Sequence, residues 1–452
     1  MTDTAVPPAK GNARYSSPGF KFLAVVLLTL CMVIPLFFIG LALDGREEMA
    51  SDAASDIASG WGANQTVSGP VLFIPYEYKT ESLVDGKAVV TTNRDEAVIL
   101  PSALNIDTDA NVETRWRGIF EVPVYRSSIG LKASFTRAAF DGVFPQGATI
   151  FWNAAYASVV VTDPRGLAAN VTLQVNDHSA TFEPGIGSQN KLANGIHAPL
   201  GLSGPPQALN LHATIGLRGS KELSFAPMGE QTVARLHSTW PDPSFFGNFL
   251  PNEHAINDKG FSASWSVPYL ARGTSQSFAS APDAISTLTA SAFGVRFYQP
   301  VGFYQLVERS LKYAILFVGL ALLVFFVTEL VSVKRLHVMQ YALIGAAQVL
   351  FYLLLLSFAE HIGFGLSYLA AAAGTIAMTC AYAWSAFASA ARAAVLAVLL
   401  GTLYALLYVI LQQEDYALLI GALLLFFALG ATMYATRKID WYRVAPIGPQ
   451  PS

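Results

Sequence analysis

Cysteine and charged residues are scarce in this sequence. Only two of its 452 residues are cysteine, Cys31 and Cys380, and Asp, Glu, Lys and Arg together make up 13%. Apolar residues make up 53%, and so few charges in so apolar a chain exclude an ordinary soluble protein and indicate a membrane protein. Both cysteines lie in long apolar runs, so a water-facing domain elsewhere in the chain forms no disulfide and depends on a large apolar core.

The familiar signatures of enzymes and metal sites are missing as well. The chain has no HExxH, no Gly-x-Ser-x-Gly, no phosphate-binding loop and no cysteine–histidine zinc spacing. The stretch PGIGSQN (184–190) begins like a dinucleotide fingerprint but lacks the third glycine, so we expect a turn there. Five histidines lack ligand-like spacing and are expected on the surface or on strands: His178, His197, His212, His237 and His254. We therefore expect no enzyme activity, no cofactor and no metal site.

Six apolar runs are long enough to cross a bilayer, which takes about 20 residues in a helix. They cover 20–43, 312–333, 338–358, 362–384, 393–411 and 416–436. The first run exceeds a signal-peptide core and has no convincing cleavage site, so we expect an uncleaved anchor that tolerates Pro35. The other five predict a transmembrane bundle over 311–436, with tails at 1–19 and 437–452. The stretch 44–310 has no spanning run and is expected to face water.

Lysine and arginine are distributed unevenly around these runs. With the N-terminus in the cytoplasm, the inner side holds Lys10, Arg14, Lys21, Lys334, Arg335, Arg392, Arg437, Lys438 and Arg443. The opposite turns hold acidic residues instead, Glu360 in one and Glu414 with Asp415 in the other. The positive-inside rule then predicts cytoplasmic N- and C-termini and places 44–310 on the outer side.

The outer stretch is expected to be mainly β-structure with a helical start. Met49, Ala53 and Ile57 recur every four residues, which predicts a helix that continues from the first anchor and ends near Gly60 and Gly62. After Gly69 and Pro70, short runs rich in β-branched and aromatic residues alternate with turn residues, which is typical of a large antiparallel sandwich or twisted sheet assembly. The segment 192–206 is expected to be a loop. More acidic than basic residues in 44–310 argue against binding nucleic acid.

Few ionisable or polar residues lie inside the apolar runs. Glu329 is expected to reach the interface or to pair with Lys334, and Gln348 to form a hydrogen bond between helices. A stripe of small residues in the fourth run favours close helix packing, and consists of Ala373, Ala377, Ala381 and Ser385.

The stretch LLLLSFAEHIGFGLSY (353–368) sets an acidic residue and a histidine side by side between two apolar runs. One histidine with one carboxylate is a weak metal signal, since zinc needs three or four ligands. We therefore expect the acidic turns either to be plainly solvated or to dock the outer domain through basic residues near the membrane. We call this set the docking patch; its members are Glu360, His361, Glu414, Asp415, Arg309, Lys312 and Arg296.

Several segments resemble the bacterial inner-membrane CreD family, also called cell envelope integrity proteins. The segments are RWRGIFEVPVY (115–125), TWPDPSFFGNFLP (239–251), FGVRFYQPVGFYQLVERSLKYAILFVGL (293–320), FYLLLLSFAEHIGF (351–364) and EDYALLIGALLLFFALGATMYATRKIDWY (414–442). The resemblance runs from the first anchor to IDWY. It implies a Gram-negative inner-membrane protein with a periplasmic 44–310 domain, associated with envelope integrity, colicin tolerance and the response to β-lactam stress. It supplies no catalytic or binding residues.

Three functions remain open at this point. The first is a non-enzymatic envelope protein whose β domain binds an unknown periplasmic or inner-membrane protein or another envelope component, alongside the lipid bilayer. The second is a transport or sensing unit in which the outer domain gates the bundle, with a polar cavity lined by Gln348, Thr375, Thr379 and Thr402. The third, an enzyme acting on an envelope substrate, would need an acid–base cluster in the outer domain.

Overall fold

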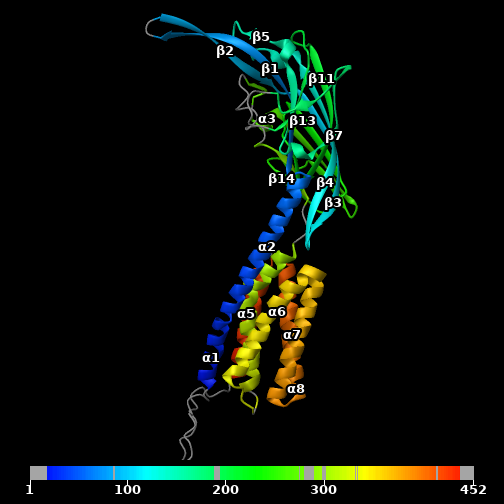
Figure 1. Cartoon of the computed structure of the whole chain (residues 1–452). Helices are drawn as coiled ribbons and strands as arrows, with labels where there is room; N and C mark the ends of the chain where they lie inside the picture. Colours follow the sequence, from blue (N-terminus) through cyan, green and yellow to red (C-terminus); the bar gives the residue numbers. More distant parts are fainter. Residues whose placement is uncertain are drawn as a thin grey trace, which may run out of the picture. The chain divides into compact units, whose positions relative to one another are not determined.

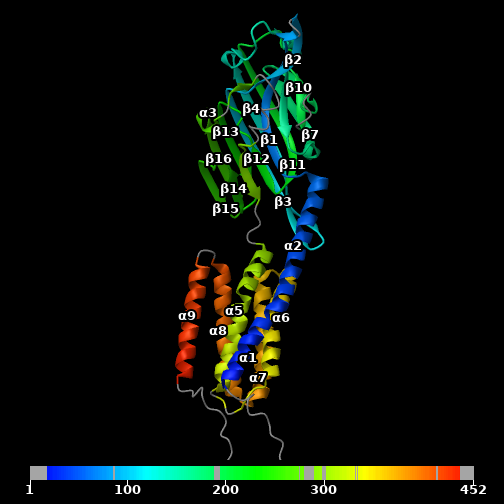
Figure 2. The ribbon, with the colours of Figure 1, turned by 90° about the vertical axis from the view of Figure 1, so that its left-hand side faces the viewer.

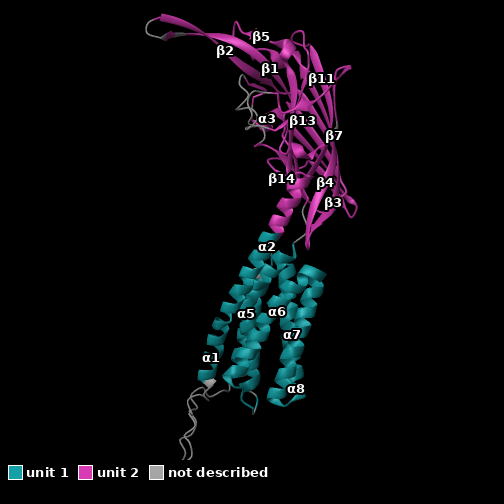
Figure 3. Cartoon of the chain, viewed as in Figure 1, with its two compact units in different colours: residues 1–49, 301–452 teal, residues 50–300 magenta. Residues whose placement is uncertain are grey.

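The computed structural model describes residues 18–84, 87–187, 194–273, 275–278, 290–297, 302–330, 332, 334–413 and 416–437. The chain divides into two compact units (Figure 3). The helical unit comprises 1–49 and 301–452, and the sheet unit comprises 50–300. These boundaries differ from the predicted 44 and 310, because helices continue past the apolar runs at both places.

A long helix begins the described chain. α1 (Pro18–Cys31) is followed after one residue by α2 (Val33–Trp61). The backbone bond from Met32 N to Leu28 O, 3.0 Å, carries the helix through this point, close to Pro35. The helix ends at Trp61, between Gly60 and Gly62, where the sequence predicts its end. Residues 50–61 of α2 belong to the sheet unit.

Five further helices belong to the described part of the helical unit (Figures 1 and 2). They are α5 (Phe303–Leu330), α6 (Val338–Ile362), α7 (Phe364–Phe387), α8 (Ala390–Gln412) and α9 (Ala417–Thr436). In the described part of the chain, Gly19–Trp61 and α5 to α8 are long and apolar enough to cross a membrane, and α9 has a shorter apolar stretch, Leu419–Tyr434. α5 starts nine residues before the predicted span, and further along the helix Lys312 pairs with Glu308 at 2.8 Å.

Two sheets make up most of the sheet unit (Figures 1 and 2). Sheet A has the order β14-β18-β12-β1-β6-β10-β9, with β2 and β5 also paired to β1 and β17 to β2; sheet B has the order β15-β16-β13-β3-β4-β11-β7-β8. The strands of sheet A are β1 (Gln65–Val84), β2 (Lys87–Ile99), β5 (Thr149–Ile150), β6 (Tyr156–Val161), β9 (Glu183–Pro184), β10 (Gly195–Pro199), β12 (Glu222–Phe225), β14 (Pro243–Gly247), β17 (Ser277–Phe278) and β18 (Phe293–Phe297). Those of sheet B are β3 (Ala103–Arg117), β4 (Phe120–Thr136), β7 (Leu167–Val175), β8 (His178–Ala180), β11 (Ala208–Ser220), β13 (Gln231–Ser238), β15 (Glu253–Asn257) and β16 (Gly260–Pro268). Short helices, among them α3 (Tyr269–Arg272), connect some of them.

One apolar core joins the two sheets. Along β11 every second residue is buried, from Leu209 to Leu217, and the residues between them face solvent. This period of two is the pattern of a sheet that covers a core on one face. Residues of both sheets, such as Phe73 and Tyr125, share a single buried cluster. The unit is therefore a β-sandwich that needs no disulfide.

The pairing differs from the prediction in two places. Most neighbours are antiparallel as expected, but β1 pairs with β12 and β3 pairs with β13 in parallel. Parallel neighbours cannot be joined by a hairpin and need long crossovers, so short-range turn signals do not reveal them. The expected loop 192–206 also contains a strand, β10, which pairs with β6.

β1 and β2 continue beyond the sandwich as a two-stranded ribbon (Figure 1). β5 pairs with β1 only at Tyr76 and Glu77. β17 pairs with β2 only at Val98 and Ile99. Among the described strands, β1 and β2 have only each other beyond these points, and they pair as far as Val84 and Lys87. We call residues 78–84 and 87–95 the arm.

Candidate functional site

A polar groove crosses the solvent face of sheet B. Its central row follows the strand register: Asn105 of β3 lies opposite Lys132 of β4, Lys132 opposite His212 of β11, and His212 opposite Gln174 of β7. The groove has a volume of about 340 Å³ and also includes Asn176 and Asn210. All four residues of the row are exposed because the alternate residues fill the core. The groove offers amides, an imidazole and one cation to a ligand.

A second groove lies on the same sheet. Its volume is about 390 Å³ and its polar lining comes from β13, β15 and β16: Arg235, His237, Glu253, His254, Ser262 and Ser264. His254 rests on the ring of Phe245, 5.5 Å between centroids. The five histidines predicted to be surface or strand residues all lie on strands, as expected. Within the described residues, no three His, Cys, Asp or Glu side chains gather as a metal ion would need.

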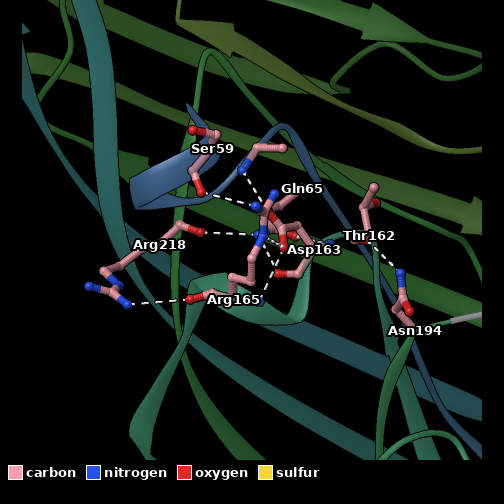
Figure 4. Close-up of polar contacts among 8 residues, drawn as sticks. Ser59, Gln65, Thr162, Asp163, Arg165, Asn194 and Arg218 are labelled. Carbon is pink, nitrogen blue, oxygen red and sulfur yellow. Dashed lines mark hydrogen bonds and ion pairs between the residues drawn. The ribbon is translucent and has the colours of Figure 1, made fainter. Parts of the chain in front are cut away.

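The end of α2 is tied to the sandwich by a buried carboxylate (Figure 4). Asp163 accepts from the backbone N–H of Ala63 at 3.0 Å and from the guanidinium of Arg165 at 2.8 and 2.9 Å. Gln65 holds the Asp163 backbone with bonds of 2.9 and 3.1 Å and also donates to the carbonyl of Arg218 at 3.1 Å. The hydrogen bonds from Arg165 hold the pKa of the Asp163 carboxyl below its ordinary value. The carboxylate thus stays charged and joined to the helix end at neutral pH.

Arg165 extends this junction back onto α2. Its guanidinium also donates to the carbonyl of Ser59 at 3.0 Å (Figure 4). The Asp163-Pro164 pair starts a short 3-10 helix, with the Asp163 side chain accepting from the Arg165 N–H. An Asp before Pro is a recognisable helix-start signal, so the sequence contained a clue to the cap. It contained none to the partner just after α2, Ala63, which is 100 residues away.

Trp61, the last residue of α2, is surrounded by arginines. Arg115 lies 3.8 Å, Arg126 5.0 Å and Arg218 5.2 Å from the centre of its ring. The indole N–H donates to the carbonyl of Tyr125 at 3.3 Å. Cations over an indole face are attracted by its quadrupole, so Trp61 binds the helix end to β3, β4 and β11.

Glu360 of the docking patch is a buried carboxylate within the helical unit. Its side chain is 5% exposed and lies 3.4 Å from the Nε of Arg46 on α2. The hydroxyl of Tyr304 on α5 donates to it at 3.1 Å. His361 is exposed, and its Nδ1 is 3.1 Å from the carbonyl of Ser357 in its own helix. The pair in AEHI is therefore split between a helix-bridging carboxylate and a surface histidine.

Two other members of the docking patch have partners of their own. Lys312 pairs with Glu308 on α5, and Arg296 pairs with Glu222 of β12 at 2.6 Å and lies over Phe246. Arg309 lies on α5. Glu414 and Asp415 lie outside the described residues. The predicted docking contacts stay predictions.

Glu329 has a different partner from the predicted Lys334. It is 6% exposed, and it accepts from the ammonium of Lys21 on α1 and from the hydroxyl of Tyr341 on α6, the latter at 2.6 Å. Of the two expected alternatives, pairing with Lys334 was wrong, because Lys334 is exposed and lies beyond the end of α5 at Leu330. Lys21 also donates to the carbonyl of Leu336 at 3.0 Å. The group links three helices.

Gln348 forms the predicted hydrogen bonds between helices. It donates to Thr379 of α7 at 3.3 Å and accepts from Tyr404 of α8 at 2.9 Å. Thr375 is buried as well, but Thr402 is exposed and bonds to Val398 of its own helix. The four polar residues expected to line one cavity are therefore not together.

The small-residue stripe of α7 faces outward rather than into the bundle. Ala373, Ala377, Ala381 and Ser385 are all exposed, whereas Ala371, Thr375 and Thr379 are buried. The close helix packing expected of this stripe is therefore not formed within the described part of the chain. The buried side of α7 instead carries aromatic and polar residues that contact α6 and α8, such as Tyr368 and Thr379.

The fold and these sites define a multi-pass α-helical membrane protein that carries a β-sandwich domain. Comparison with known proteins gives the family. The sequence model described as "Inner membrane protein CreD" matches residues 17–442, and the chain belongs to the CreD family. It is 33% identical over 431 residues to the inner membrane protein CreD of Escherichia coli (strain K12), covering 94% of both chains. The family is one of inner-membrane proteins, as the resemblance implied.

A solved structure with partial similarity is that of an M1 zinc metallopeptidase from Deinococcus radiodurans. It shares 9% identity over 43% of each chain, with a TM-score of 0.18. A similarity at this level carries no argument about fold or chemistry.

Proposed function

We propose that this protein is a non-enzymatic inner-membrane protein that supports envelope integrity, including tolerance to β-lactams and colicins, and whose sandwich binds an envelope component. Membership of the CreD family supports the membrane setting. The observation that carries the binding role is the row of Asn105, Lys132, His212 and Gln174 across four strands. Such a row presents fixed donors and acceptors at strand spacing on a rigid sheet.

The chemistry of the row indicates the kind of partner. Amides exchange hydrogen bonds with hydroxyl and amide groups, and Lys132 adds a cation for a carboxylate or phosphate. Glycan and peptide parts of the envelope carry these groups. The residues of the row are exposed on a sheet surface, so we expect contact with an extended or polymeric partner.

The test uses the full chain in a strain that lacks its own copy. A photo-crosslinking residue at Asn105 is expected to capture an envelope component. Lys132→Ala and His212→Ala are expected to reduce both the capture and the β-lactam tolerance. Lys259→Ala, an exposed lysine in the turn between β15 and β16, is the matched control and should change neither. Wild-type capture and tolerance in both groove variants would remove the binding role.

A second function, sensing by the outer domain, is favoured by one observation. α2 is a single helix whose residues 33–49 belong to the helical unit and 50–61 to the sheet unit. A continuous helix can pass a displacement on, whereas a flexible linker absorbs it. Inserting two glycines after Met49 should abolish tolerance while leaving capture at Asn105 intact. Unchanged tolerance would argue against sensing and leave the binding role standing.

A further inference from the structure

The arm lies far along β1 from the end of α2. Gln65, at the start of β1, is bonded within the α2 junction. β1 then runs for 20 residues, about 60 Å at about 3.3 Å per residue. Figures 1 and 2 both show the arm at the opposite end of the sheet unit from α2. The arm therefore projects from the far end of the domain.

The outer edge of β2 is uncovered along the arm. Among the described strands, β17 is its neighbour on that side and reaches only Val98 and Ile99. Lys87 to Thr92 are all exposed, and Val90 is 54% exposed. An edge strand offers unpaired N–H and C=O groups to another strand. The run Val89, Val90, Thr91 and Thr92 is β-branched throughout, which favours extended pairing.

The charges that usually protect such an edge do not block this one. Arg94 is held by Glu77 across the ribbon at 2.7 Å. Lys87 and Asp95 lie on the same face of β2, four residues on either side of Thr91. When two β2 strands pair antiparallel about Thr91, each Lys87 lies opposite Asp95 of the other strand. Opposite charges at directly facing positions stabilise a sheet, so the edge is complementary to itself.

We propose that the arm binds a second copy of this chain, with the two β2 edges paired antiparallel and a two-fold axis at Thr91. The paired segment runs from Lys87 to Asp95. Each copy then contributes the same surface to the interface, as in closed homodimers with two-fold symmetry. An isolated two-stranded ribbon is only marginally stable in water, and the second copy turns two ribbons into one four-stranded sheet.

Cysteine crosslinking of the full chain in membranes tests the contact. Cys31→Ser and Cys380→Ser provide a thiol-free background. Thr91→Cys should then form a reducible dimer under mild oxidation or with a short bis-maleimide, because directly opposite Cβ atoms lie about 4.5–5.5 Å apart. Thr80→Cys is the matched control, since Thr80 is exposed and lies opposite Thr91 in the same arm. In the proposed four-stranded sheet the two Thr80 positions lie on the outer strands, three strand spacings or about 14 Å apart, so this variant should form far less dimer.

Charge exchange at the two-fold position gives an independent readout. Thr91→Lys and Thr91→Glu each place like charges opposite each other, and each should lower the dimer fraction several-fold. Co-expression of the two variants should restore it, since Lys then faces Glu. Position 91 is exposed, so neither change touches the core, and an unchanged melting temperature checks that both variants fold.

Three outcomes would overturn the proposal. They are a Thr91→Cys dimer no stronger than that of Thr80→Cys, crosslinking of Thr91→Cys to a different protein, and no rescue in the mixed charge variants. The second would assign the edge to an extended strand of an envelope protein instead. Specific Thr91 crosslinking together with the rescue supports it.

Discussion

Asp163 is the residue on which the junction between α2 and the sandwich depends. Asp163 is 6% exposed, and its carboxylate accepts hydrogen bonds from the backbone N–H of Ala63 and the side chain of Arg165. In Asp163→Asn the amide group must face at least one of these donors, so one bond is lost. We expect a cost of about 1.5–3 kcal/mol, the range for a hydrogen bond to a charged group. Faster hydrogen exchange at residues 58–66 would report it, and unchanged exchange would contradict the assignment.

The same carboxylate makes the junction sensitive to acid. Its pKa is lower in the folded protein than in the unfolded chain, mainly through the hydrogen bonds from Arg165. The stabilisation is therefore complete above the unfolded value of about 3.9 and is lost as the pH falls through the lower, folded pKa. The protection of amides 58–66 against hydrogen exchange, taken relative to the intrinsic exchange rate at each pH, should therefore fall in that acidic range for the wild type. Asp163→Asn should lack this pH dependence.

Glu360 should matter for stability where its neighbour His361 does not. Glu360→Ala leaves the hydroxyl of the buried Tyr304 without its acceptor, a loss of about 1–3 kcal/mol. His361→Ala changes an exposed side chain and should stay within about 0.5 kcal/mol. Thermal unfolding in detergent measures both. Equal melting temperatures for the two variants would show that AEHI is an ordinary turn.

A double-mutant cycle separates the partners of Glu360. Coupling is expected between Glu360→Ala and Arg46→Ala, and additivity is expected with Arg296→Ala, which has its own partner in Glu222. Because Arg46 is half-exposed, the coupling should be modest, about 0.2–1 kcal/mol. Coupling with Arg296 in place of Arg46 would favour the docking patch over the pairing described above.

At the scale of elements, the helix α2 should depend on its terminal tryptophan. Trp61→Phe keeps an aromatic face for the arginines and loses the bond to Tyr125, a cost of about 1 kcal/mol. Trp61→Ala also loses the ring contacts with Arg115, Arg126 and Arg218 and should cost about 2 kcal/mol or more. Limited proteolysis between α2 and β1 should follow the order Ala, Phe, wild type. Any other order would mean that the contacts between Trp61 and the three arginines do not hold the helix end.

Local sequence patterns predicted the helices and strands better than they predicted which of these elements contact each other. Apolar runs and four-residue spacing indicate the helices, and two-residue alternation along segments such as β11 indicates a sheet with one buried face. Long-range pairings leave no such signal. Lys21 and Glu329 are 308 residues apart, and the parallel neighbours β3 and β13 are brought together only by the shared core. For the same reason the groove residues, which are ordinary exposed strand positions, could not be selected from the sequence.

At the scale of the whole molecule, orientation is the property to measure next. The lysine and arginine distribution predicts cytoplasmic termini and a periplasmic sheet unit. Alkaline phosphatase, which is active only in the periplasm, should therefore be active when fused after Gly130 or Gly229. It should be inactive after Arg335, Arg392 or Arg443, where a cytoplasmic reporter should be active instead. α9 makes the last fusion informative, because its described apolar stretch, Leu419–Tyr434, is shorter than those of the other helices. Phosphatase activity after Arg443 would mean that α9 does not cross, and activity after Arg335 would contradict the six-span topology altogether.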